Sequence, residues 1–112
     1  MARTITYAET MLADAVLQQV AAVNDSRYNP LERTSKVQIF AVASVADILL
    51  SFSLGSDEHA ASIVLPIAGA VSTRDHLVGE GVGFRGQKIT IGLHCITAAS
   101  VGRGMLVLNP IA

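Results

Sequence analysis

Two short segments place a carboxylate beside an imidazole, the combination that acid–base catalysis uses. They are Asp57-Glu58-His59 and Arg74-Asp75-His76. Both segments lie in predicted turns, where such residues commonly make local hydrogen bonds. The nearest serines, Ser56 and Ser72, lack the glycines of a G-x-S-x-G nucleophile elbow. We therefore expect no catalytic residues, and we do not expect the chain to be an enzyme.

Glycines at positions 81, 83 and 86 fit the dinucleotide-binding pattern G-x-G-x-x-G. That pattern binds a cofactor only between a strand and a helix, where the helix N-terminus faces the pyrophosphate. Here the glycines lead into residues 87–96, whose apolar residues alternate as in a strand. The sequence therefore predicts a glycine-rich hairpin or bulge before that strand, with no cofactor.

The chain has three histidines and one cysteine, the residue types that bind zinc. They are His59, His76, His94 and Cys95. Zinc sites usually include two ligands close in sequence on one loop, whereas the adjacent His94 and Cys95 of a strand point to opposite faces. We therefore expect no metal site. The single cysteine also excludes an internal disulfide and suits synthesis in a reducing cytoplasm.

Composition limits the remaining function classes. Apolar residues make up 51% of the chain and charged residues 15%, against about 25% charged in a typical soluble domain. The net charge is −1 and the eight basic residues are scattered, so binding to nucleic acid is not expected. The apolar excess points to a membrane, to contacts with other subunits or to aggregation.

The longest apolar stretch, residues 37–54, is long enough to span a membrane as a helix. Asp47 lies near its middle, and a central aspartate costs about 2.5–3.5 kcal/mol on insertion. The stretch also reads as strand, because Ile48, Leu50, Phe52 and Leu54 share one face. We therefore expect no membrane association and assign the apolar excess to contacts with other subunits.

Alternating apolar residues predict strands along most of the chain. The predicted strands cover residues 4–7, 37–45, 47–54, 62–67, 87–96 and 105–108. The absence of βαβ alternation predicts a mainly β, single-domain antiparallel sandwich, jelly-roll-like, with a core over residues 36–112. Residues 1–35 are expected to form an N-terminal segment and a contact loop.

The predicted core contains the inward-facing apolar residues of these strands. They are Val37, Ile39, Ile48, Leu50, Phe52, Leu54, Ile63, Leu65, Ile89, Ile91, Leu93 and Val107. Residues 9–23 are harder to assign. They lack Gly and Pro and are rich in good helix formers, which slightly favours a short N-terminal helix. Their Ala and Val content leaves a strand open.

Arg27, Tyr28 and Arg33 lie in a polar loop around Pro30. Arg and Tyr are favoured at the centres of protein interfaces. The loop is therefore either an arm that contacts a neighbouring subunit, with these three as interface residues, or a solvated connector. The two interpretations have equal weight.

Several segments together resemble a known class of protein. They are the loop 24–30, the strands 37–41 and 47–51, the strand entry 83–91 and the segment 97–100. This order is similar to that of small β-sandwich structural proteins of bacteriophages and other virus particles, of the capsid decoration (cement) or minor capsid type. The resemblance covers roughly residues 37–110 and brings no catalytic residues.

The resemblance implies a virion protein that forms a homo-oligomer, often a trimer, on or between capsid subunits. Its partners would be copies of itself and other capsid subunits, without a small-molecule substrate. A ligand- or receptor-binding β-sandwich module is the alternative, although the absence of Trp argues against sugar stacking. A small oligomeric enzyme that uses His59 or His76 is a third hypothesis.

Overall fold

The computed structural model describes residues 3–11, 15–24, 26–44, 48–95 and 100–111. Within them the chain forms eight strands and one short helix, α1 (Ala21–Asn24). The strands are β1 (Arg3–Met11), β2 (Ala15–Gln19), β3 (Ser35–Ala43), β4 (Ile48–Leu54), β5 (Asp57–Val64), β6 (Leu77–Gly83), β7 (Ile89–Cys95) and β8 (Ser100–Pro110). The prediction of a mainly β fold is confirmed.

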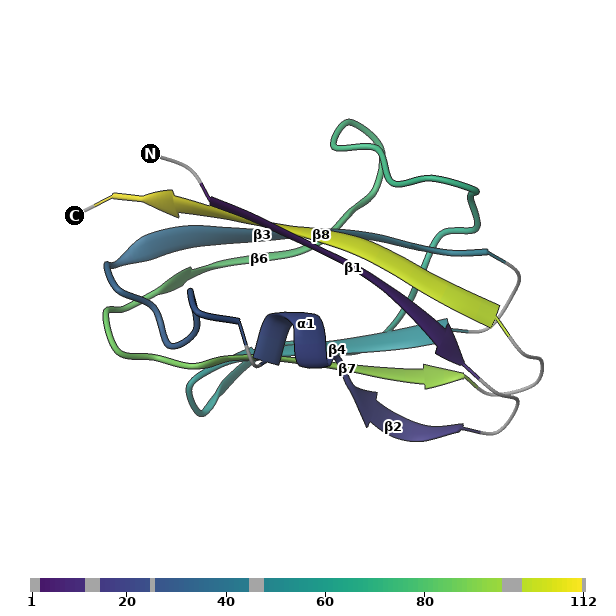
Figure 1. Ribbon diagram of the computed structural model, residues 1–112, viewed down its shortest axis with the longest axis horizontal. Coiled ribbons are helices and arrows are strands. Elements are labelled where there is room, and N and C mark those ends of the chain that lie inside the picture. Colours follow the sequence, from purple (N-terminus) through teal and green to yellow (C-terminus); the bar gives the residue numbers. More distant parts are fainter. Residues whose placement is uncertain (1–2, 12–14, 25, 45–47, 96–99, 112) are drawn as a thin grey trace.

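The strands pair as one long hairpin that has been rolled up. The first strand pairs with the last, β2 with β7, β3 with β6 and β4 with β5, always antiparallel. Further pairing of β8 with β3 and of β7 with β4 gives two four-stranded sheets, ordered β1-β8-β3-β6 and β2-β7-β4-β5. Figure 1 shows the two sheets as facing layers. This is the jelly-roll form of the β-sandwich.

The core lies between the two sheets because strand alternation turns every second side chain inward. In β4 the residues Ile48, Leu50, Phe52 and Leu54 are buried and alternate with half-buried neighbours. Strand β3 is central in its sheet and is buried on both faces toward its end, which confirms its predicted position. Much of the apolar excess is therefore covered within the chain.

Two of the predicted core residues are placed differently. Val107 is half-buried on the outer face of β8, and its neighbours Leu106 and Leu108 are buried instead. The register of β8 with β3 sets this, because Leu106 lies opposite Ile39, which is buried in the core. Ile63 packs against the core but is only partly buried.

Residues 9–23 follow the strand alternative more closely than the slightly favoured helix. Strand β1 continues through Glu9 to Met11, β2 follows, and helix is confined to the four residues of α1. Strand β1 pairs with β8 along its whole length, and this tertiary pairing outweighs a modest local helix propensity. Strands β1 and β2, which lie within the predicted N-terminal segment 1–35, are strands of the two sheets.

The glycine-rich segment forms no hairpin, because three of its glycines belong to strand β6. Strand β6 belongs to one sheet and β7 to the other, so their connector crosses between sheets. Gly79, Gly81 and Gly83 lie opposite residues 39, 37 and 35 of β3, which are buried. Three glycines of β6 therefore lie on its inner face, and Val78 packs against the core beside them. The predicted strand 62–67 lies earlier than expected, as β5.

The glycine face allows close contact between the sheets, where side chains of the opposite sheet fill the space. A Cβ added to Gly79 would lie 3.3 Å from the Phe52 ring, and one on Gly81 would lie 2.8 Å from His59 Nδ1. His59 in turn packs on Phe52, with ring centroids 5.6 Å apart. These contacts bring β6 onto β4 and β5 and close that side of the sandwich.

A second glycine contact tests the packing between β1 and β8. Gly104 lies opposite Tyr7, whose buried ring occupies the space that a Cβ on Gly104 would need. We expect Gly104→Ala to lower the free energy of unfolding by about 1–3 kcal/mol, as overpacking does. Urea unfolding measures this. The control is Gly69→Ala, because its added Cβ meets nothing within 4 Å. Equal stability of the two variants would contradict the packing.

Candidate functional site

A cavity of about 180 Å³ lies at the end of the sandwich where the chain enters β1 and leaves β8. Figure 1 shows the N- and C-terminal ends close together there. The cavity is lined by Arg3, Tyr28, Leu31, Glu32, Arg33, Ser35, Leu108 and Pro110. The start of β1, the loop after α1, the start of β3 and the end of β8 therefore all contribute to it.

The loop that carries Tyr28 is held firmly against the edge of β7. The Asn29 side-chain amide donates a hydrogen bond to the Ile89 carbonyl and its oxygen accepts one from the Ile89 N–H, both at 2.8 Å. The Asn24 side-chain oxygen accepts a hydrogen bond from the Ile91 N–H at 3.2 Å. These amides continue the pairing that β2 begins, so the loop covers the edge of β7 and its position is fixed by the sheet.

The ring of Tyr28 contacts two arginines. The Cζ atoms of Arg3 and Arg27 are 4.9 and 5.0 Å from the centre of its ring, within the range of cation–π attraction. Arg27 also donates a hydrogen bond from Nη2 to the Tyr28 hydroxyl at 2.8 Å. This hydrogen bond lowers the pKa of the Tyr28 phenol, with a further contribution from Arg3 and a smaller opposing effect of burial. It also raises the pKa of Arg27.

The structure brings the three predicted interface residues to one end of the molecule. Tyr28 and Arg33 line the cavity, and Arg27 contacts it through Tyr28. Whether a neighbouring subunit binds them stays a prediction. Sequence reasoning missed Arg3, because only the pairing of β1 with β8 brings the first strand to this loop. No local pattern around Arg3 signals the contact.

The histidines considered for catalysis or metal binding have structural contacts. His76 Nδ1 accepts a hydrogen bond from the Ser72 N–H at 2.8 Å, and the Ser72 carbonyl accepts one from the His76 N–H. These two bonds close the loop before β6. His59 packs on Phe52. Among the described residues, no group of three His, Cys, Asp or Glu side chains is placed to hold a metal ion.

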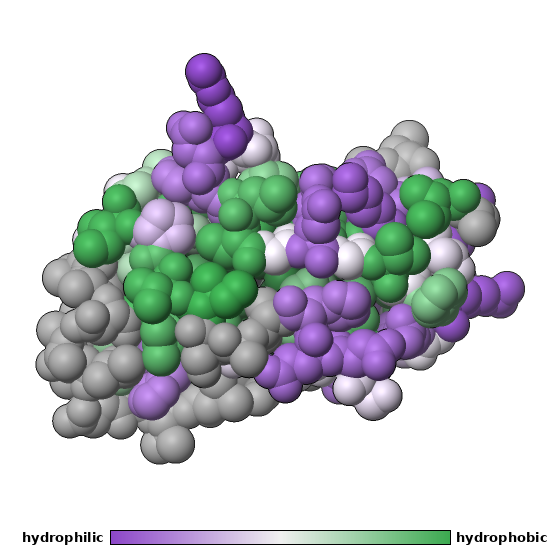
Figure 2. Space-filling view, turned by 180° about the vertical axis from the view of Figure 1, so that it is seen from behind, coloured by the Kyte–Doolittle hydropathy of each residue, from purple (hydrophilic) through white to green (hydrophobic). Residues whose placement is uncertain are grey.

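A second candidate is the surface along β5 and β6, the edge strands of the two sheets. Four large apolar residues of these strands and their connector are exposed here. They are Val64 (67%), Ile67 (64%), Leu77 (47%) and Val82 (44%). We call them the edge surface. Figure 2, seen from this side, shows hydrophobic patches toward both ends with hydrophilic residues between them.

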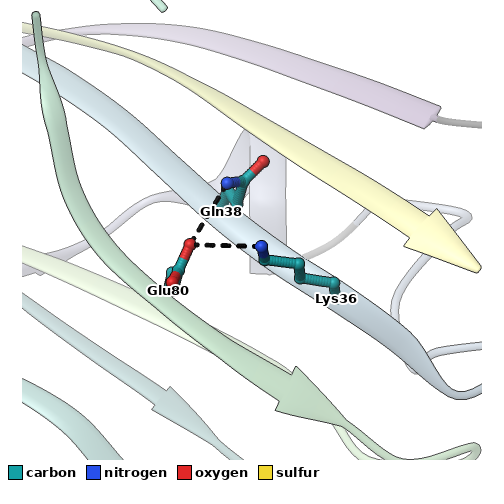
Figure 3. A network of polar contacts seen from close by, with 3 residues as sticks. All are labelled: Lys36, Gln38 and Glu80. Atoms are coloured by element: carbon teal, nitrogen blue, oxygen red, sulfur yellow. Dashed lines mark hydrogen bonds and ion pairs between the residues drawn. The ribbon is translucent and has the colours of Figure 1, made fainter. Parts of the chain in front are cut away.

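Edge strands usually carry charges that prevent pairing with other chains. The only charged residue of β6 is Glu80, and β3 partly neutralises it. Lys36 Nζ lies 3.7 Å from Glu80 Oε2, and Gln38 donates a hydrogen bond to the same oxygen at 3.1 Å (Figure 3). The protection of the β6 edge is therefore weak, whereas β5 begins with the exposed Asp57 and Glu58.

Comparison with protein-family models, with curated proteins and with solved structures gives no significant match for the chain. None of the helices in the described residues is long and apolar enough to cross a membrane. The geometry of the cavity and of the edge surface is therefore the basis for proposing a function.

The two tyrosines are expected to ionise in separate steps. Burial, with a smaller contribution from Glu9, raises the pKa of Tyr7 above its usual value of 10.0, whereas Arg27 lowers that of Tyr28. Phenolate absorbance measured against pH should show Tyr28 ionising first. Arg27→Gln should raise the pKa of this first step and leave the second unchanged. A single step for both phenols would contradict the Tyr28 contacts.

Proposed function

We propose that the chain is a structural subunit of a virus particle, of the capsid decoration (cement) or minor capsid type. It binds copies of itself and neighbouring shell proteins through the edge surface. This surface is the observation that carries the proposal, because it exposes apolar side chains along two sheet edges. Exposed groups of large apolar side chains are typical of protein–protein contacts.

Burial of the edge surface supplies the free energy of assembly. Complete burial of one large apolar side chain contributes about 1.5–3 kcal/mol, and these four residues are 44–67% exposed. One contact therefore yields a few kcal/mol before the cost of association. Repetition over many copies in a shell makes such modest contacts cumulative. A decoration protein needs affinity of this kind.

The fold supports the same proposal by analogy. Eight strands in a jelly roll are the architecture of viral capsid domains, and also of lectins and cupins. Fold alone does not decide among these functions. The interior between the sheets is filled by apolar side chains in the described part of the chain, so the outer surface is where a partner binds. The edge surface favours assembly over ligand binding.

Charging the edge surface should weaken self-association. Val64→Lys places a charge where a neighbour covers an apolar side chain that is 67% exposed in the single chain. We expect the dissociation constant of the oligomer to rise about tenfold or more. Light scattering after size-exclusion chromatography, over a concentration series, measures the mass.

The matched control is Thr6→Lys, which adds the same charge at an exposed position of β1. Strand β1 is the edge strand opposite β6 in the sheet β1-β8-β3-β6, so Thr6 lies away from the edge surface. It should leave the mass of the oligomer unchanged. A wild-type chain that elutes as a clean monomer at micromolar concentration would overturn the proposal. So would an equal effect of the two substitutions.

A further inference from the structure

The cavity at the end of the sandwich has a polar rim and an apolar floor. Leu31 and Leu108 are buried beneath it, 4% and 3% exposed. The Ser35 hydroxyl is occupied, since it donates a hydrogen bond to the Arg33 carbonyl at 2.9 Å. A volume of about 180 Å³ is close to that of a cavity of roughly 150 Å³ that holds one benzene molecule. A ligand for this cavity is therefore small and partly apolar.

The charge around the cavity is positive. Arg3 and Arg33 line it and Arg27 lies beside it, against one glutamate, Glu32. Among the described residues, no carboxylate lies within ion-pair distance of Arg3 or Arg27, whose guanidinium groups pack on Tyr28 instead. Stacking uses the face of a guanidinium group and leaves N–H donors at its edge. Those donors match the two oxygens of a carboxylate.

We infer that this cavity binds a carboxylate carried on a short apolar group. The apolar group packs on Leu31 and Leu108, and the carboxylate lies at the rim beside Arg3, where Arg33 adds positive charge. A phosphate fits less well, because it presents charged oxygens to the apolar floor and because Glu32 repels a dianion more strongly than a monoanion. The ligand is either a small organic acid or a carboxylate of a neighbouring protein chain, and both present the same chemistry.

Binding can be followed by NMR titration of the backbone amides of Leu31, Ser35 and Leu108. The probes are isobutyrate, its neutral analogue isobutyramide, and inorganic phosphate. We expect isobutyrate to shift these signals saturably, isobutyramide to leave them unchanged, and phosphate to bind more weakly than isobutyrate. Equal shifts with isobutyramide, or tighter binding of phosphate, would overturn the inference.

Substitution of the rim identifies the binding groups. Arg3→Gln should weaken isobutyrate binding about tenfold, because it removes charge-assisted hydrogen bonds. Arg33→Gln should also weaken it, because it removes a positive charge from the rim. The control Arg74→Gln removes the same charge from an exposed loop outside the cavity and should have no effect. Dispersed amide spectra verify folding, and Arg3→Gln decides the question if Arg33→Gln is unfolded. Equal binding by Arg3→Gln and Arg74→Gln would contradict the site.

Light scattering separates the two sources of the carboxylate. If a neighbouring chain supplies it, excess isobutyrate and Arg3→Gln both lower the mass of the oligomer. If a free organic acid supplies it, the mass is unchanged while the amide shifts persist. The test is independent of the edge surface, since Val64→Lys leaves the cavity intact. Failure of one proposal is therefore distinguishable from failure of the other.

Discussion

Close approach of the two sheets along β6 is the constraint on which the rest of the structure depends. The rolled hairpin closes only if its third pair, β3 with β6, lies directly over its fourth, β4 with β5. Glycines on the inner face of β6 allow this, because Phe52 and His59 of the opposite sheet occupy the space that side chains would fill. The side chains that β6 does carry face outward for the most part. The glycines on the inner face of β6 close the sandwich, and the outward side chains of the same strand leave Leu77 and Val82 exposed.

The two sides of the sandwich differ in how the edges of their sheets are covered. On one side the loop after α1 covers β7, and the Asn29 side chain pairs with a backbone group as a further strand would. Those hydrogen-bonding groups are satisfied within the chain. On the other side, β5 and β6 end their sheets, and Glu80 is the one charged residue of β6. A chain that covers one side of the sandwich and exposes large apolar side chains on the other is suited to a place beside other subunits.

Alternation predicted the class of fold, because strands such as β4 repeat buried and half-buried positions at every second residue. It failed where partners far away in sequence decide the structure. Residues 9–11 are strand because β8 pairs with them. Gly79, Gly81 and Gly83 lie on one face of β6, and their spacing of two residues is typical of a strand. They were assigned to a hairpin instead because residues 81–86 also fit the G-x-G-x-x-G pattern. The loop with Tyr28 and Arg33 was recognised from residue type, but Arg3 reaches it only through sheet pairing.

The most direct test of the central claim is to image particles purified from cultures that produce the protein, by electron cryomicroscopy. The account predicts that the jelly roll is present in many copies on the shell. It also predicts that the β5–β6 side, with Val64 and Leu77, is buried against a neighbouring subunit. Absence of the chain from the particles would contradict the account, and so would a position in which that side faces solvent.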